Sequence, residues 1–285
     1  MSPLVLALVA LAAIAHATWN VAIKRAGASG TGFLWLTFIV GAVVFLPFGV
    51  WSLIAEEVDF VHWLWLAAVS GAVQIGYFFL LQKGYRAGDV SVVYPLARGT
   101  GPLLTVVLAI VLFGERPGVI ALIGAATIIA GVIITGSAGQ RLGGGNRAGI
   151  WFGLSIGVLI AAYTLWDSAA VTFGGMPAVA LYWGSVTFQM VLLAPLALRD
   201  RGTLVATARR QWVAVLVVGV LSPLAYILIL LAIQLAPVSM VAPAREVSVV
   251  LVSLAGWLFF REPHPVQRLI GATVVLAGIV LLAFA

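Results

Sequence analysis

Four ionisable side chains lie inside long apolar runs of this sequence, where charge is otherwise rare. They are Arg98, Asp167, Arg245 and Glu246. Placing one such side chain in hydrocarbon costs about 2.5–3.5 kcal/mol on insertion scales, so each is a candidate functional residue that needs a partner. The alternative role for these residues is structural, as ion pairs that fix the register of neighbouring helices.

Arg98 belongs to a polar face on an otherwise apolar helix. At 100° per residue, spacings of 3, 1, 3 and 4 gather side chains within one face of ~100°, here Ser91, Tyr94, Pro95, Arg98 and Pro102. The planar fork of an arginine holds an oxyanion through two charge-assisted hydrogen bonds. We therefore expect Arg98, supported by Tyr94 one turn earlier, to bind a carboxylate or another oxyanion.

A second segment repeats the pattern around Arg98. A shift of 148 residues aligns VSVVYP with VSMVAP and puts Glu246 opposite Arg98, whereas a shift of 147 puts Arg245 there. Both registers remain open at this point. In either register, two helices carry charge at a similar depth in the membrane. Glu246 is then expected to pair with a substrate ammonium group or with Arg98. Prolines inside both helices are expected to kink or break them and to expose backbone groups.

The first and sixth predicted helices share another repeated pattern. A shift of 147 residues maps His16, Trp19 and Asn20 onto Tyr163, Trp166 and Asp167. Trp19 and Trp166 are candidates to stack on a planar or cationic substrate, although large aromatic residues at helical spacing more often serve packing. Weaker candidates for hydrogen bonding are Gln74, Tyr77 and Gln82 on the third predicted helix and Tyr182 and Gln189 on the seventh.

Signatures of enzymes are absent from the sequence. There is no cysteine, and the run GGGN (Gly143 to Asn146) is not followed by the lysine of a phosphate-binding loop. The three histidines, His16, His62 and His264, are too far apart in sequence to indicate a metal site. We expect no catalytic residues, no metal and no cofactor.

Composition identifies the solvent that must surround this chain. Of its 285 residues 63% are hydrophobic and 8% are charged, whereas an ordinary globular protein is about 25% charged. This excludes soluble enzymes, nucleic-acid binders and disordered scaffolds, and indicates a lipid bilayer as the surroundings. Because lipid offers backbone groups no partner, the predicted fold is all-α. Ten spans of about 20 residues match the length.

The apolar runs between clusters of glycine, proline and charge predict ten transmembrane helices. Interfacial tryptophans are expected near their ends, at Trp51, Trp63, Trp65, Trp151 and Trp212. The predicted spans are 4–23, 32–53, 63–83, 90–113, 119–136, 149–168, 178–198, 212–234, 239–260 and 266–284.

The distribution of basic residues predicts the orientation in the membrane. Of fifteen basic residues, twelve lie in or beside alternate loops, and the opposite side has only Arg116. The positive-inside rule places the basic loops in the cytoplasm and therefore both termini outside it. The twelve residues are Lys24, Arg25, Lys83, Arg86, Arg141, Arg147, Arg199, Arg201, Arg209, Arg210, Arg261 and Arg268.

An internal repeat divides the chain into two halves. The run Leu122 to Gly136 matches Leu269 to Ala283 at a shift of 147 residues. We expect a first five-helix repeat at 1–136, a polar glycine-rich linker at 137–147 and a second five-helix repeat at 148–285. Since five is odd, equivalent helices run in opposite directions across the membrane, and inverted repeats of this kind build binding sites near the midplane.

The repeated motifs resemble those of the EamA-like transporters of the drug/metabolite transporter superfamily, along nearly the whole chain. The resemblance rests on HATWNVAIK, VSVVYPLARGTGP, FGERP and FREP. It implies a secondary carrier for small metabolites in the plasma (inner) membrane. It also implies a cavity lined by the first, third and fourth helices of each half, with the last helices packed between halves. Members are described in either orientation, so charge alone supports the orientation predicted here.

Two classes of substrate compete. Arg98 and Arg245 favour zwitterionic or anionic metabolites such as amino acids, exported or exchanged by alternating access, whereas Asp167, Glu246 and the aromatic residues favour efflux of hydrophobic or cationic drugs. Equal numbers of basic and acidic groups favour a zwitterion. An intramembrane or lipid-processing enzyme is a weaker alternative, and a homodimer is left open. The predicted substrate-binding residues are Arg98, Tyr94, Glu246, Arg245, Trp19, Asn20, Trp166, Asp167, Tyr163 and Gln74.

Overall fold

The structure is a computed structural model that describes residues 1–28, 30–88, 90–137, 147–260 and 265–285. Side chains at positions 90, 91, 257, 259, 260 and 265 also lie outside the described part. Four features considered above therefore cannot be placed. They are the side chain of Ser91, the GGGN run with Arg141, the FREP motif from Arg261, and His264.

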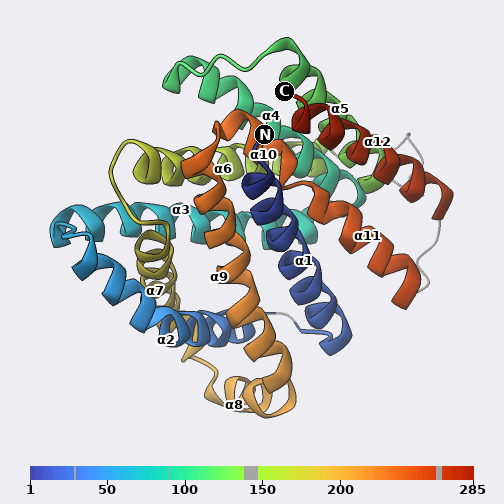
Figure 1. Cartoon of the computed structure of the whole chain (residues 1–285). Coiled ribbons are helices and arrows are strands. Elements are labelled where there is room, and N and C mark those ends of the chain that lie inside the picture. Colours follow the sequence, from blue (N-terminus) through green and yellow to red (C-terminus); the bar gives the residue numbers. More distant parts are fainter. Residues whose placement is uncertain (29, 89, 138–146, 261–264) are drawn as a thin grey trace.

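Ten described segments are long and apolar enough to cross a membrane, which confirms the all-α, multi-pass architecture. Their helices begin and end near the predicted positions (Figure 1). Nine of the segments are single helices: α1 (Pro3–Ala26), α2 (Thr31–Ala55), α3 (Phe60–Ala87), α4 (Val90–Phe113), α5 (Val119–Gly136), α6 (Arg147–Thr172), α7 (Ala178–Ala197), α9 (Trp212–Leu235) and α12 (Pro265–Ala283).

The ninth span is broken, as its internal proline suggested, and one further helix was not predicted. The span expected at 239–260 consists of α10 (Val238–Ala244) and α11 (Val247–Phe260). A short exposed helix, α8 (Arg201–Arg210), lies between α7 and α9, with no buried residue. Its N-cap is Asp200, whose carboxylate accepts a hydrogen bond from the amide of Thr203 at 2.9 Å. Hydrogen bonds from Thr203 hold the pKa of this exposed carboxyl below its usual value.

Local sequence explains where the first helix begins and ends. Ser2 caps α1 by accepting a hydrogen bond from the amide of Val5, and Pro3 occupies the first turn, where its missing N–H is not needed. Gly27 ends the helix with a φ of 58°, a left-handed conformation that glycine adopts without steric cost. The apolar residues between these ends make the segment long enough to span a bilayer.

The contact between α5 and α12 shows that the halves are related by a pseudo-two-fold axis. Gly124 lies against the carbonyl of Gly278, and Gly131 lies against the carbonyl of Gly271. Because Gly271 and Gly278 are the counterparts of Gly124 and Gly131 at the 147-residue offset, each contact is repeated with the halves exchanged. Residue numbers rise on one helix as they fall on the other, so the equivalent helices are antiparallel. This confirms the inverted repeat.

The remaining helices also pack mainly between halves. α1 packs on α9 as α6 packs on α3, and α2 packs on α7. Likewise α4 packs on α6, and its counterpart contact joins α11 to α1. Figure 1 shows α5 and α12 side by side at one edge of the molecule, with the two chain ends close together. The amino group of Met1 donates to the carbonyl of Ala283 at 3.3 Å, which places both termini at the same face.

Indole groups join the halves within the buried core. Trp63 lies near the start of α3, as expected, but it is only 7% exposed and packs inside the bundle. It stacks on Trp183 with ring centroids 5.5 Å apart and donates to the carbonyl of Ala180 at 2.9 Å. Trp183 in turn donates to the carbonyl of Ala42 at 3.0 Å. Trp63 and Trp183 therefore both bond across the boundary between the halves.

Candidate functional site

A break in the ninth span positions two of the predicted charges. Pro243 has no N–H to donate, and the chain tightens after it into bonds between residues three apart. The amide of Glu246 donates to the carbonyl of Pro243 at 2.9 Å, and the amide of Ser248 donates to the carbonyl of Arg245 at 3.1 Å. Arg245 and Glu246 consequently lie in the turn between α10 and α11, as predicted for a helix interrupted near a binding site.

Arg98, Arg245 and Glu246 form one charged cluster. Nη1 of Arg98 lies 3.4 Å from Oε1 of Glu246, and Nε of Arg245 lies 3.5 Å from the same oxygen. The second oxygen of Glu246, Oε2, is buried and has no hydrogen-bond partner among the described residues. Two guanidinium groups therefore share one carboxylate, and the cluster carries an excess of one positive charge.

Two further side chains hold the guanidinium of Arg98. Nη2 of Arg98 lies 3.4 Å from Nε2 of His16. Because arginine can only donate, the ring nitrogen of His16 is the acceptor. The guanidinium carbon also lies 5.8 Å from the ring centroid of Tyr94, one turn earlier on α4. The expected association of Arg98 with Tyr94 is therefore present in the structure.

The Arg98–Glu246 contact resolves which residue faces Arg98. The two positions are 148 residues apart, which is the offset that superposes VSVVYP on VSMVAP. The contact lies where α4 meets α10, between the two halves of the chain. Glu246 is thus the ion-pair partner of Arg98, and Arg245 adds a second cation from the same half as Glu246.

Asp167 lies in a separate network of neutral hydrogen-bonding groups. The hydroxyl of Tyr226 donates to Oδ2 of Asp167 at 2.8 Å, and Nε2 of Gln74 donates to the same oxygen at 3.4 Å. Gln74 also donates to Ser70 at 3.0 Å and to Ser185 at 3.3 Å. The network therefore joins α3, α6, α7 and α9 around one carboxyl group.

Tyrosine rings surround this network. Tyr163 lies 5.9 Å from Tyr77 and 5.9 Å from Tyr226, measured between ring centroids. Tyr182 lies 4.9 Å from Tyr226. The ring contacts thus lead from Tyr77 through Tyr163 to Tyr226, the phenol that donates to Asp167.

The two tryptophans of the repeat differ in their surroundings. Trp166 donates to the carbonyl of Leu66 at 3.0 Å and packs edge-on against Trp65 at 4.8 Å, which is a packing role. Trp19 packs against His16 at 4.7 Å, and its buried indole N–H has no partner in the described part of the chain. The equivalence of the two positions in sequence therefore does not extend to their contacts.

Asn20 and Asp167 also differ although they are equivalent by sequence. Nδ2 of Asn20 donates to the carbonyl of His16 at 2.7 Å. Asn20 lines a cavity of about 70 Å³ between α1, α11 and α12, together with Lys24, Ser253 and Arg268. The structure thus separates Asn20 from the network of Asp167.

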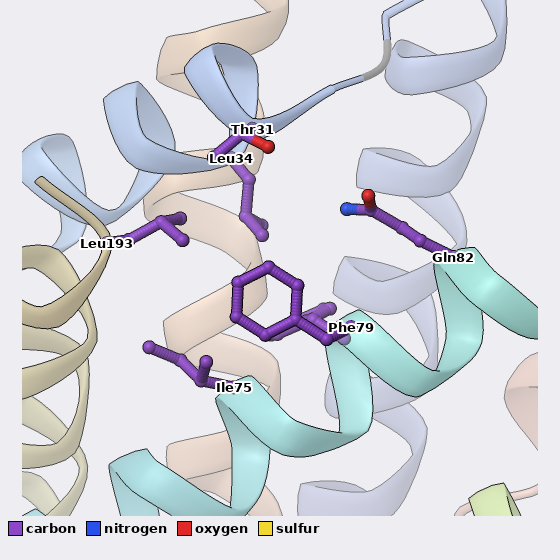
Figure 2. A pocket seen from close by; sticks show the side chains of 7 residues that line it. Thr31, Leu34, Ile75, Phe79, Gln82 and Leu193 are labelled. Atoms are coloured by element: carbon purple, nitrogen blue, oxygen red, sulfur yellow. The ribbon is translucent and has the colours of Figure 1, made fainter. Parts of the chain in front are cut away.

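A second recess, of about 10 Å³, lies between α2, α3 and α7, and has room for about one water molecule. Figure 2 shows its mainly apolar lining, with Phe79 at its centre and the amide of Gln82 at one side. The weaker candidate Gln82 lines this recess and is not part of the network around Asp167. Neither cavity is lined by Arg98 or Asp167.

Three network residues were missed by the sequence analysis. Ser70, Ser185 and Tyr226 carry no repeat signal, and serines in apolar helices commonly bond to their own backbone. Tyr226 was detectable as the one tyrosine in a long apolar span. Gln189, a weaker candidate, donates to Oε1 of Gln74 at 3.2 Å and belongs to the network. Among the described residues no group of three or more His, Cys, Asp or Glu could hold a metal ion.

Comparisons with known proteins agree with this architecture. No curated protein sequence matches the chain. A solved structure described as "Crystal structure of protein" covers 98% of this chain and 98% of its own, with a TM-score of 0.76 and 18% identity, a likeness of fold. The model of the EamA-like transporter family matches twice, over residues 3–137 and 147–284. With ten apolar spans in its described part and two inverted repeats, this chain belongs to the EamA-like transporter family.

Proposed function

We propose that the protein is a secondary active carrier of zwitterionic or anionic small metabolites, amino acids and related compounds foremost, which it exports or exchanges by alternating access. The observation that supports this class of substrate is the shared carboxylate of Glu246. Two guanidinium groups contact one of its oxygens, at 3.4 and 3.5 Å. The excess positive charge favours an arriving carboxylate.

Arg98 is the residue we assign to that carboxylate. A guanidinium has five N–H donors, and the contacts of Arg98 to Glu246 and His16 engage its two terminal nitrogens in part. A substrate carboxylate would accept the remaining donors of Arg98 and Arg245. The location between the two halves of the chain suits alternating access, because the halves rock about a site near the midplane.

Efflux of hydrophobic cations is the competing function, and one observation favours it. The tyrosines around Asp167 present ring faces near an acidic group, an arrangement that suits a cation. Asp167 is nevertheless a single acid, and the charged cluster has a net positive charge. An organic cation without a carboxylate would provide no anionic group for Arg98 and Arg245.

The proposal includes a location and an orientation. We place the protein in the plasma (inner) membrane as a multi-pass protein, with the basic loops in the cytoplasm and both termini outside. The exposed helix α8 supports this orientation, because it carries three arginines that the positive-inside rule assigns to the cytoplasmic surface.

Counterflow in proteoliposomes tests the class of substrate. Vesicles loaded with one unlabelled amino acid should accumulate the same labelled compound, and the panel should pair amino acids with tetraalkylammonium and aromatic cations. We expect counterflow of zwitterions or carboxylates that is absent from vesicles without protein. Transport confined to the organic cations would replace this proposal with the drug-efflux function.

A further inference from the structure

Among the described residues two acids are buried, and they differ in whether a cation contacts them. Glu246 contacts two guanidinium groups. In the described part of the chain no ion pair joins Asp167 to a cation, although it is only 1% exposed. The side chains that interact with its carboxyl, those of Tyr226, Gln74 and Ser70, are all neutral. Asp167 is therefore the buried acid whose charge lacks a partner.

The hydrogen bonds of Asp167 are all on one side of the carboxyl group. Tyr226 and Gln74 both donate to Oδ2, at 2.8 and 3.4 Å. Oδ1 is buried and has no partner among the described residues. An ionised oxygen left this way in a low-dielectric interior costs free energy comparable to or greater than a lost hydrogen bond. A cation or a proton at Oδ1 removes that cost.

The surrounding network bonds to Oδ2 of Asp167 and orients the amide of Gln74. Gln189 donates to Oε1 of Gln74 at 3.2 Å, which fixes the amide so that its nitrogen faces Asp167. That nitrogen is then occupied by Ser70, Ser185 and Oδ2 together. The carboxyl is thus held in one orientation by groups on other helices, while Oδ1 is left without a hydrogen bond from the described residues.

Among the described groups near Asp167, the other acid is Glu246, which two guanidinium groups contact. Arg245 acts on it electrostatically, but that guanidinium already contacts Glu246. The other neighbouring side chains are phenols or members of the charged cluster of Arg98, Arg245 and Glu246. Element by element, the charged and titratable side chains are Tyr163 on α6, Tyr77 on α3, Tyr182 on α7, Tyr226 on α9, Arg98 on α4, and Arg245 with Glu246 after α10.

We propose that Oδ1 of Asp167 is a coupling site at which a proton and the ammonium group of the substrate bind alternately. The inference rests on the proposed function, because it needs a substrate with an amino group. In the step that exchanges them, the protonated carboxyl releases its proton and the carboxylate accepts the ammonium, so one proton leaves for each substrate that arrives. Each binding event excludes the other, which couples export of the substrate to entry of a proton.

Paired substrates test the coupling. The probes are labelled leucine, phenylalanine and glutamate, each beside its 2-oxo analogue, which keeps the carboxylate and lacks the ammonium. For the amino acids we expect the apparent affinity of the wild type to weaken by up to about tenfold for each unit of pH lost, because one proton competes with one substrate. The 2-oxo analogues should lack this dependence, and Asp167→Asn should remove it.

Three variants keep the test interpretable. Asp200→Asn neutralises an exposed acid at the N-cap of α8 and should retain the pH dependence. Tyr226→Phe keeps Asp167 but removes its 2.8 Å hydrogen bond. It should shift the pH at which the affinity changes without abolishing the change. An Asp167→Asn protein that transports with the pH dependence of the wild type would overturn the inference.

An infrared measurement separates this inference from the proposed function. Purified protein in bilayers should show the carbonyl band of a protonated carboxyl in acid-minus-alkaline difference spectra. The band should be lost in Asp167→Asn and kept in Asp200→Asn. Absence of the band from the wild type overturns the proton site even when transport is found. If the wild type instead moves no member of the panel, the proposed function fails, and with it the coupling role of Asp167.

Discussion

Neutralising Arg98 and neutralising Glu246 should have very different effects on stability, because Glu246 contacts two cations and Arg98 contacts one carboxylate. At an effective dielectric of about 20, contacts at 3.4 and 3.5 Å are each worth about 5 kcal/mol of Coulomb attraction before desolvation. Arg98→Gln removes one contact and leaves Glu246 paired with Arg245. Glu246→Gln removes both contacts and leaves two neighbouring guanidinium groups.

The expected free energies of unfolding follow from this difference. Breaking a buried pair by removing one partner costs about 3–5 kcal/mol, because the other charge is left uncompensated. Glu246→Gln should reach that range. Arg98→Gln should lower the free energy of unfolding by less than this, because Glu246 remains paired with Arg245. The double variant should recover part of the loss of Glu246→Gln, since one cation fewer is then unpaired.

Thermal unfolding of the purified variants in bilayers measures this order, and leucine counterflow measures function in the same samples. Arg116→Gln is the matched control, since it removes a positive charge at an exposed position. We expect Arg98→Gln to be folded and inactive toward carboxylates. Equal destabilisation by Arg98→Gln and Glu246→Gln would refute the compensating role of Arg245. Transport at the level of the wild type by a stable Arg98→Gln protein would remove Arg98 from the substrate site.

Three further predictions concern the scaffold. Gly131→Ala would place a Cβ 2.7 Å from the backbone nitrogen of Val275 in α12. This overpacking costs about 1–3 kcal/mol and should lower the melting temperature. In Gly76→Ala the new Cβ would meet only a methyl group of Leu159, at 4.0 Å, so the melting temperature should stay unchanged or rise. Glu115→Gln should increase hydrogen exchange at the amide of Val238, because that amide donates to the Glu115 carboxylate at 2.8 Å. A fusion after Ala285 to a reporter that fluoresces in the cytoplasm alone should stay dark, and bright cells with active protein would reverse the orientation.

The architecture was predictable because the bilayer imposes it. Hydrocarbon leaves backbone groups without outside partners, so every apolar run of sufficient length had to be a helix. The repeated glycines at Gly124 and Gly271 were visible at a fixed offset, and they make the reciprocal contacts of α5 and α12. The short helix α8 was missed because its composition is polar and it crosses nothing.

The candidate site was only partly predictable. The sequence marks Arg98, Glu246 and Asp167 by itself, since ionisable groups in apolar helices stand out whatever their partners. It left open whether Arg245 or Glu246 faces Arg98, because offsets of 147 and 148 align different parts of the repeat equally well. The structure shows the contact itself: Glu246 pairs with Arg98, and Arg245 contacts the same oxygen of Glu246.

The amino-acid composition and the internal repeat alone thus predicted the number of spans, their inverted arrangement and the charges inside them. These features depend on the surrounding lipid and on the length of the chain. Tertiary structure alone decided which neutral groups surround Asp167. Ser70, Ser185 and Tyr226 come from three helices far apart in sequence. Their convergence depends on helix rotation and depth, which side-chain packing sets, so no local pattern records it. For the same reason Asn20 and Asp167, equivalent in the repeat, came to lie in different surroundings.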